Sequence, residues 1–128
     1  MVLGIGIDLT EIKEVKRLAE DVGEAFLSKT FSQMEREASK TAADPFEYLA
    51  SRFAVKEAVF KALAHLTKEK TFDFRIVETL NHEDGSPYVT ITPVLKELME
   101  EAGVKRLLVS VTHEKDYAGA IVIAESDI

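Results

Sequence analysis

The strongest folding signal in the chain is DPFEYLASRFAVKEAVFKALA, residues 44–64, which is its longest strongly periodic stretch. Asp44 can cap a helix, Pro45 suits the first helical position, and Glu47 can complete a box-like pairing with the free amides. We therefore predict that a helix begins here. On the helical repeat its apolar side chains share one stripe, which we expect to face the core: Phe46, Leu49, Ala50, Phe53, Ala54, Phe60 and Ala64.

Two charged residues interrupt this apolar stripe. Glu57 falls in its middle and Lys61 lies near it. Removing a carboxylate and an ammonium group from water is costly unless each has a partner or a metal ion. The two residues are four positions apart, so they can simply pair with each other in a partly wet groove. They can also mark a functional site, and the segment alone leaves both interpretations open.

Length and composition predict one soluble globular domain, residues 1–128. The chain is 46% hydrophobic and 30% charged, which is ordinary for a globular fold. It has no cysteine, so disulfides, thiolate catalysis and cysteine zinc sites are excluded. The lack of cysteine also suits a reducing compartment, and we expect the protein to be cytoplasmic.

The N-terminal residues MVLGIGIDLTEI have no basic region followed by a sustained apolar one, and no apolar run approaches the length of a membrane span. We therefore expect a soluble, unprocessed chain without a membrane partner. The net charge of −7 argues against nucleic-acid binding, because phosphate attraction needs a basic surface. An acidic partner would have to meet a local basic patch.

Residues 2–9 alternate in character, which predicts a strand buried on one side. Gly4, Gly6 and Asp8 share one face, and the glycines would let another backbone or a ligand come close. Asp8 follows the two glycines on this face, at the end of the predicted strand, where it, or Thr10, can also cap the next helix. The other face carries Leu3, Ile5, Ile7 and Leu9.

A helix is predicted from Glu11 to a stop signal at Gly23. Lys13, Lys16 and Arg17 share its outward face. This cationic face could dock an acidic partner, or it could be an ordinary solvated helix surface.

The remaining pattern interleaves helices and strands without a regular βαβ rhythm. Asp84-Gly85 is a strong turn signal between two of the strands. The fold class is therefore α+β, with a mainly antiparallel sheet and a long helix packed on it. The other predicted elements are one or two helices in 26–40, strands at 71–80 and 88–92, a helix from Pro93 to Gly103, and strands at 106–113 and 117–125.

Asp8 and Glu57 are carboxylates on separate elements that could converge. A magnesium ion uses few protein ligands of this kind and takes substrate phosphates for the rest of its coordination shell. Lys61 could supply a point charge to phosphate. His113, where a strand meets a turn, is weak evidence by itself, because a lone histidine there is more often a polar end to the strand.

Three stretches, GIGIDLTEI, RFAVKEAVFKAL and VSVTHEKDYAGAIVI, occur in this order, with a DG-x-P turn between the second and third. In this combination the chain resembles, over almost its whole length, the holo-acyl-carrier-protein synthase family of 4'-phosphopantetheinyl transferases. The resemblance implies a magnesium-dependent transfer of phosphopantetheine from coenzyme A to a serine of apo acyl carrier protein, releasing adenosine 3',5'-bisphosphate. It also implies a role in fatty acid biosynthesis and a homotrimer with sites between subunits.

The resemblance also assigns residues. It implies that Asp8 and Glu57 bind the metal and that Lys61 lies near the pyrophosphate. The positions implied to contact the coenzyme are Arg52 and His113 in its pocket and the turn around Gly85 and Pro87 at its adenosine end. The serine needs a base, which could be Glu57, directly or through a metal-bound water, or Lys61.

Two departures from the family pattern affect binding. The family commonly has a glycine-rich turn where this chain has Ala64-His65-Leu66-Thr67, and an arginine where it has Glu14. Carrier docking is therefore expected to rest on Lys13, Lys16 and Arg17, or on a rearranged register of the first helix.

Two alternatives to a transferase remain. The first is a non-catalytic subunit of the same fold that binds coenzyme A and carrier protein, against which the retention of Asp8, Glu57 and Lys61 argues. The second is another magnesium-dependent nucleotide phosphotransferase, and the absence of a G-x-x-x-x-G-K-[ST] loop argues against the P-loop kind.

Overall fold

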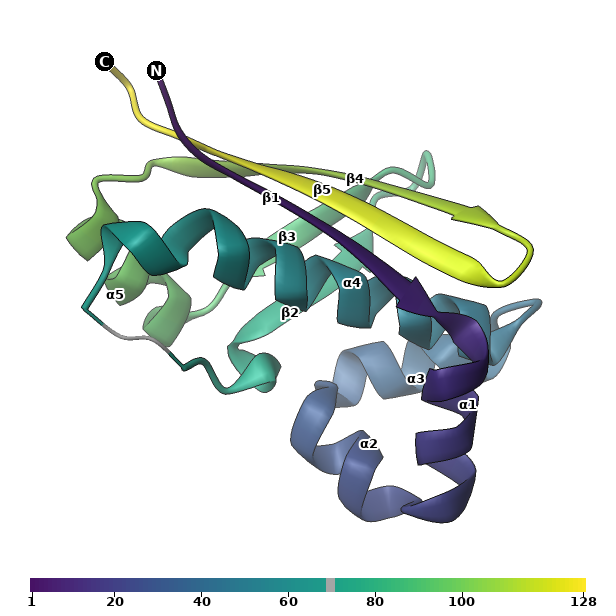
Figure 1. Ribbon diagram of the computed structural model, residues 1–128. Helices are drawn as coiled ribbons and strands as arrows, with labels where there is room; N and C mark the ends of the chain where they lie inside the picture. The colour runs from purple at the N-terminus through teal and green to yellow at the C-terminus, as the bar shows by residue number, and fades with distance from the viewer. Residues whose placement is uncertain (69–70) are drawn as a thin grey trace.

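The computed structural model describes residues 1–68 and 71–128 and confirms the α+β class. A three-stranded antiparallel sheet in the order β1-β5-β4 lies over a long helix, α4, and a two-stranded antiparallel sheet, β2-β3, passes behind that helix in the view of Figure 1, with β3 in contact with β4. The elements are β1 (Val2–Glu11), α1 (Ile12–Asp21), α2 (Glu24–Thr30), α3 (Gln33–Thr41), α4 (Pro45–Leu63), η1 (Ala64–Leu66), η2 (Phe74–Ile76), β2 (Val77–Asn81), β3 (Pro87–Ile91), α5 (Pro93–Ala102), β4 (Arg106–Glu114) and β5 (Tyr117–Glu125).

The start of α4 confirms the predicted cap. The Asp44 side chain accepts a hydrogen bond from the Glu47 amide at 3.1 Å, and Pro45 is the first helical residue. The Glu47 carboxylate lies 3.3 Å from Nε2 of His113 on β4, where it joins the helix to the sheet. The predicted return bond of Glu47 to the cap is replaced by this contact.

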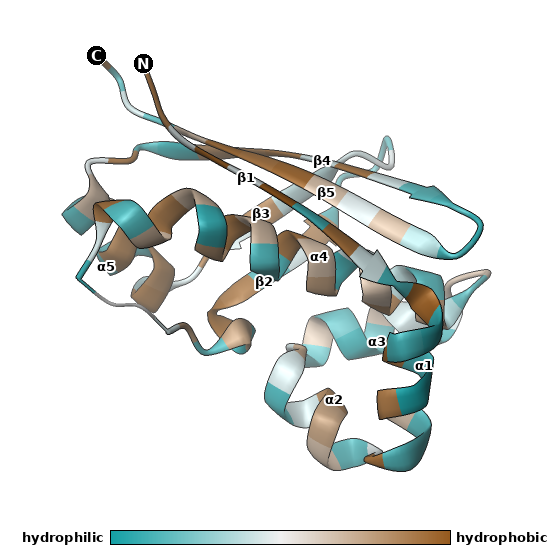
Figure 2. Cartoon of the chain, in the orientation of Figure 1, coloured by the Kyte–Doolittle hydropathy of each residue, from teal (hydrophilic) through white to brown (hydrophobic). Residues whose placement is uncertain are grey.

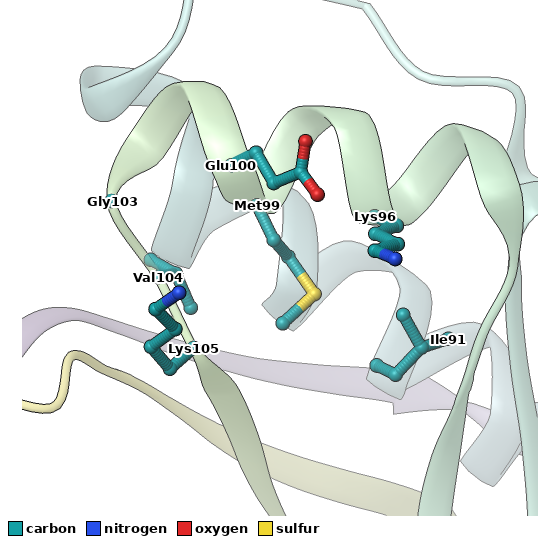
Figure 3. Close-up of a pocket in the computed structure, with 7 residues that line it drawn as sticks. All are labelled: Ile91, Lys96, Met99, Glu100, Gly103, Val104 and Lys105. Atoms are coloured by element: carbon teal, nitrogen blue, oxygen red, sulfur yellow. The ribbon is translucent and has the colours of Figure 1, made fainter.

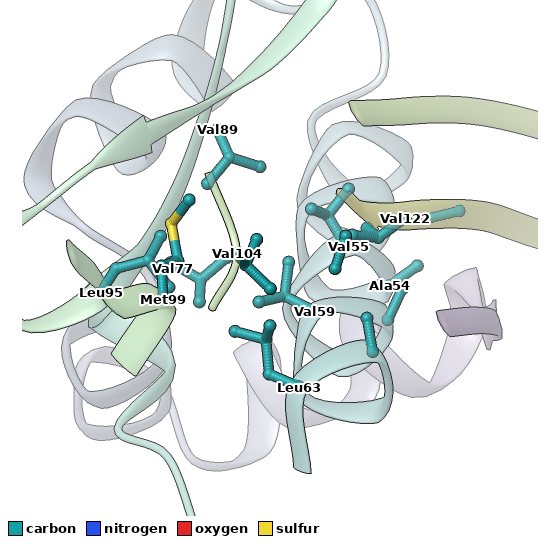
Figure 4. Packing of buried hydrophobic residues seen from close by; sticks show 14 residues of the cluster. Ala54, Val55, Val59, Leu63, Val77, Val89, Leu95, Met99, Val104 and Val122 are labelled. Carbon is teal, nitrogen blue, oxygen red and sulfur yellow. The ribbon is translucent and has the colours of Figure 1, made fainter. Parts of the chain in front are cut away.

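The predicted single apolar stripe of α4 is wrong, because the helix is buried on almost every side. β1 and β5 cover one flank, and α3, β2 and α5 contact the others. Val55, Val59 and Leu63 lie outside the predicted stripe and are fully buried. Figure 4 shows them packed among Val77, Val89, Leu95, Met99, Val104 and Val122.

The face of β1 that packs on α4 is the glycine face. A Cβ atom on Gly6 would lie 1.8 Å from the Ala58 carbonyl oxygen, and one on Gly4 would lie 2.2 Å from that of Ala62. The glycines therefore admit another backbone, as one of the two predicted uses required. The opposite face of β1 is apolar but exposed: Ile5 is 59%, Ile7 64% and Leu9 71% accessible. Figure 2 shows that β1 and β5 are largely hydrophobic, whereas α1 is mostly hydrophilic.

Two local predictions are wrong. Asp8 lies within β1, and α1 begins after Glu11 with no side-chain cap, so neither Asp8 nor Thr10 caps that helix. The predicted strand at 71–80 begins only at Val77, because Asp73 accepts a hydrogen bond from the Arg75 amide and starts the 3-10 turn η2.

The remaining elements follow the prediction. The region 26–40 forms α2 and α3, and α5 ends at Gly103, whose φ of 75° is the left-handed conformation that favours glycine. Within the described residues, no helix combines the length and the apolar character needed to cross a membrane.

Candidate functional site

Asp8 and Lys61 meet where the glycine face of β1 packs on α4. Nζ of Lys61 donates to Oδ1 of Asp8 at 3.2 Å and to the Ile7 carbonyl at 2.9 Å. The Thr10 hydroxyl donates to the other Asp8 oxygen at 2.8 Å. Both Asp8 oxygens are thus held in place, and only 14% of the side chain is accessible, whereas 49% of Lys61 is.

Glu57 completes this group, which we call the carboxylate cluster: Asp8, Glu57 and Lys61. Partial burial raises the pKa of Glu57, the negative charge of Asp8 raises it further, and Lys61 opposes the shift. Lys61 makes its ion pair with Asp8. Among the described residues no ion pair joins Glu57 to Lys61, so pairing within the helix does not account for these two charges.

The carboxylate cluster fits a divalent cation by its donor set. Burial is the larger cause of the raised pKa of Glu57, and the like charge of Asp8 adds to it; a cation bound by both acids would relieve that repulsion. Within the described residues no group of three or more His, Cys, Asp or Glu side chains could hold a metal ion. Two carboxylates are nevertheless the usual protein share for magnesium, whose other ligands are waters and substrate phosphates.

A second group lines a cavity of about 320 Å³ between α4, the β2–β3 turn and β4. We call it the Arg52 cavity. It brings together Arg52, Gly85, Pro87 and His113, the four residues that the resemblance assigns to the coenzyme pocket but not to the metal site. The other lining residues are Ala42, Ala43, Asp44, Glu47, Tyr48, Ser51, Asn81 and Val111.

Arg52 is only 4% accessible, yet its positive charge has no negative partner among the described residues. Its Nε donates to the Thr79 carbonyl at 3.3 Å, its Nη1 to the Ser51 hydroxyl at 3.0 Å, and its Nη2 to the Asn81 side-chain oxygen. All three acceptors are neutral. A buried cation held in this way makes the cavity attractive to an anion.

The carboxylate cluster and the Arg52 cavity share no residue, and Val111 lies between them, lining both the cavity and a depression beside Asp8. None of the residues of the carboxylate cluster lines the Arg52 cavity. Asp8 borders a shallow apolar depression of about 320 Å³ on the exposed face of the sheet, together with Ile7, Leu9 and Ile121. The sequence pointed to both sets of residues but not to this separation.

The predicted cationic face of α1 has less net positive charge than its sequence suggests. Lys13, Lys16 and Arg17 are all exposed. Arg17, however, is paired with Glu14 and lies 3.6 Å from Asp21, so most of its charge is compensated within the helix. The positive charge of this face therefore comes from Lys13 and Lys16.

Sequence reasoning missed several residues around the Arg52 cavity. The centroid of the Tyr48 ring lies 3.9 Å from the Arg52 guanidinium carbon, and the Asn81 side-chain oxygen accepts a hydrogen bond from that guanidinium. Glu35 and Lys56 form a fully buried ion pair at 2.7 Å. The S-x-x-E spacing of Ser32 and Glu35 signals the capping box that α3 forms, but nothing in it signals the contact with Lys56.

A different cavity, of about 380 Å³, lies between α5 and the start of β4 (Figure 3). Lys96, Met99, Glu100 and Lys105 line it with Ile91, Gly103 and Val104. None of the residues predicted for function lies there, so this cavity does not belong to the site.

Comparison with known proteins identifies the family of the chain. A family model described as the 4'-phosphopantetheinyl transferase superfamily matches residues 4–122. A holo-[acyl-carrier-protein] synthase of Thermodesulfovibrio yellowstonii is 40% identical, over 96% of this chain and 98% of that protein. The crystal structure of the Neisseria meningitidis holo-[acyl-carrier-protein] synthase superposes with a TM-score of 0.88 at 32% identity, over 98% of this chain and all of that one.

A further solved structure bears on the ligand. The Helicobacter pylori holo-[acyl-carrier-protein] synthase, in complex with coenzyme A, superposes with a TM-score of 0.79 at 25% identity, over 94% of this chain and 99% of that one. The sequence, the fold and these relatives lead to one conclusion: the chain belongs to the holo-[acyl-carrier-protein] synthase family of the 4'-phosphopantetheinyl transferase superfamily.

Proposed function

We propose that this protein transfers the 4'-phosphopantetheine arm of coenzyme A to a serine of apo acyl carrier protein, forming holo carrier protein and adenosine 3',5'-bisphosphate. The observation that carries this proposal is the meeting of Asp8, Glu57 and Lys61 across β1 and α4 in a chain of this family. Such a transfer needs little covalent chemistry from the protein. It needs phosphates held in position and their charge neutralised.

Each charged residue has a part in this transfer. The serine oxygen forms a bond to the phosphorus of the phosphopantetheine arm, and the bond from that phosphorus to the bridging pyrophosphate oxygen breaks. Glu57 is the proposed acceptor of the serine proton. Lys61 stabilises the charge on the pyrophosphate.

Asp8 and Glu57 are proposed to hold Mg²⁺, and the bound ion would neutralise phosphate charge. Nζ of Lys61 donates to Oδ1 of Asp8. Because Lys61 is half exposed, its ammonium group is free to turn from Asp8 to a phosphate. The Thr10 hydroxyl keeps the Asp8 carboxylate oriented in both arrangements.

Coenzyme A is proposed to occupy the Arg52 cavity with its adenosine end. The uncompensated charge of Arg52 faces the coenzyme phosphates there, and the turn at Gly85 and Pro87 forms the wall beside the adenosine. His113, exposed at the rim and 3.3 Å from Glu47, adds a hydrogen-bonding group. Carrier protein, which is acidic in this proposal, docks on Lys13 and Lys16, with a smaller contribution from Arg17.

We also propose a cytoplasmic homotrimer with sites between subunits. The exposed face of the β1-β5-β4 sheet is apolar, and a face of this kind is typical of an interface between copies. Its exposed hydrophobic residues are Ile5, Ile7, Leu9, Leu108 and Ile121. Assembly through this face would bring the carboxylate cluster of one chain to the Arg52 cavity of its neighbour.

The test is a transfer assay. Purified protein is incubated with coenzyme A, Mg²⁺ and several apo carrier proteins, and the intact mass of each carrier is measured. We expect the mass of one phosphopantetheine to be added, the addition to stop with a chelator, and excess Mg²⁺ to restore it. No mass change on any carrier would contradict the proposal. Coenzyme binding without transfer would instead support a non-catalytic binding subunit.

A further inference from the structure

The ion pair between Glu35 and Lys56 is fully buried. Neither residue lines the Arg52 cavity, and neither belongs to the carboxylate cluster. Nζ of Lys56 donates to Oε1 of Glu35 at 2.7 Å, to the Phe74 carbonyl at 2.9 Å and to the Val77 carbonyl. Burial lowers the pKa of Lys56, and the Glu35 carboxylate opposes that shift. Because apolar residues often replace a buried ion pair without loss of stability, stability is a weak account of this one.

The second oxygen of Glu35 points to a different purpose. Oε2 accepts from the Thr79 amide of β2 at 3.0 Å, while Oε1 also accepts from the Ser32 amide at 2.9 Å. One carboxylate thus joins α3, the Lys56 side chain of α4 and the Thr79 peptide of β2. The position of that peptide depends on this carboxylate.

The backbone of the same residue, Thr79, also contacts Arg52. The Thr79 carbonyl accepts from Nε of Arg52 at 3.3 Å, and Nη2 of Arg52 donates to the Asn81 side chain. Nδ2 of Asn81 then donates to the Gly85 carbonyl at 2.7 Å. An unbroken series of hydrogen bonds therefore runs from Lys56 to the turn at Gly85. Its last three members, Arg52, Asn81 and Gly85, line the Arg52 cavity.

We infer that Glu35 and Lys56 are positioning residues for the coenzyme: through the backbone of Thr79 they fix the direction of the Arg52 guanidinium and the place of the Gly85 turn. This inference rests on the proposed function of the cavity. The pair also has an electrostatic role. Lys56 neutralises Glu35. Without Lys56, Glu35 would place an unpaired negative charge on the residue that Arg52 contacts, Thr79, and would weaken the attraction of Arg52 for phosphate.

The kinetic test uses Glu35→Gln and the double variant Glu35→Gln/Lys56→Met, which leaves no unpaired buried charge. We expect the KM for coenzyme A to rise about tenfold in both while kcat stays within about twofold, because Glu35 orients the binding groups and touches no reacting atom. Val59→Ala is the matched control. Val59 is fully buried in the core on α4, the helix of Lys56, but takes no part in the series of hydrogen bonds. Its variant should therefore lose stability while the KM for coenzyme A stays unchanged.

A second readout does not depend on activity. Amide hydrogen exchange in residues 81–86 should accelerate in the Glu35 variants and stay unchanged in Val59→Ala, since only the former loosen the turn. Should both buried variants fail to fold, the variant Asn81→Asp, at an exposed residue, tests the series of hydrogen bonds instead. It loses the donor to the Gly85 carbonyl, which loosens the turn, so exchange at the Gly85 amide, which donates to the His82 carbonyl within that turn, should rise.

An unchanged KM together with unchanged exchange in a folded Glu35 variant would overturn the inference, as would unchanged Gly85 exchange in Asn81→Asp. If the wild-type protein transfers no phosphopantetheine, the proposed function fails, and the exchange measurement still tests the series of bonds. The two failures are therefore distinguishable.

Discussion

At the scale of the residue, Glu57 shows how surroundings set chemistry. Its carboxyl group is partly buried and faces the charge of Asp8, and both raise its pKa. For a carboxyl group whose pKa is raised in the folded state, the folded protein holds the proton more tightly than the unfolded chain. The ionised group therefore opposes folding, and this cost appears as the pH rises through the folded pKa.

We predict that Glu57→Gln abolishes transfer, with a loss of at least about 100-fold in kcat/KM, because a proposed base and metal ligand is removed. The thermal midpoint of the metal-free variant at pH 7 should equal or exceed that of the wild type, because an unfavourable charge has been removed. Full activity with unchanged magnesium dependence would contradict the assignment. A large loss of thermal stability would contradict the electrostatic account.

The pKa itself can be measured in the metal-free protein by carboxyl NMR titration. We expect the pKa of Glu57 to fall in Asp8→Asn but to stay above the ordinary value, because burial is the larger cause and remains. Lys61→Met should move it the other way, since Lys61 opposes the shift. A pKa that did not respond to Asp8→Asn would show that the two carboxylates do not interact.

At the scale of the element, the contact between β1 and α4 depends on two missing side chains. Gly6→Ala would place a Cβ atom 1.8 Å from the Ala58 carbonyl oxygen, part of the helix backbone that cannot move aside alone. We predict a loss of about 3 kcal/mol or more in the free energy of unfolding, measured with denaturant. Gly85→Ala is the control, because it meets nothing within 4 Å and should lose only the cost of a left-handed alanine, about 1 kcal/mol. Equal losses would argue against the close approach.

The surface of α1 allows a test of carrier docking. The Lys13→Glu/Lys16→Glu variant should raise the KM for apo carrier protein about tenfold and weaken its dependence on salt, because two unpaired charges are reversed. Arg17→Ala should have a smaller effect, since Glu14 and Asp21 already compensate that charge. Lys105→Glu, beside the α5 cavity of Figure 3, is the control and should leave the KM unchanged. A similar rise in the control would indicate a general charge effect.

At the scale of the whole molecule, the separation of the two clusters makes shared sites testable by mixing subunits. Arg52→Ala and Glu57→Gln should each be inactive alone. Co-expressed in one assembly, they should recover about one quarter of wild-type activity, because a shared site is intact wherever an unaltered Glu57 meets an unaltered Arg52 from its neighbour.

Asp8→Asn with Glu57→Gln is the matched control for this mixing. Both residues belong to the carboxylate cluster of one chain, so mixing these variants should restore nothing. No recovery with Arg52→Ala would place the complete site within a single chain, and recovery in the control would show that Asp8 and Glu57 do not act from the same chain. Native mass spectrometry of the wild type should independently give an assembly with three times the mass of one chain.

Much of the local structure was predictable because its causes are local. The Asp44 cap, the ends of α5, and strands β4 and β5 follow from hydrogen bonds and periodicities within a few residues. The residues of the carboxylate cluster could also be named, since a charge on an apolar helix stripe and an acid after a glycine-bared strand are visible in the order of residues.

Long-range packing determined the rest. The buried face of β1 is its glycine face, because the α4 backbone approaches it more closely than any side chain would allow. Lys61 turns to Asp8, 53 residues away, rather than to its helix neighbour Glu57. Lys56 is buried because Glu35 of α3 and the carbonyls of Phe74 and Val77 surround it. No local pattern encodes these contacts, since each depends on how separate segments come together in space.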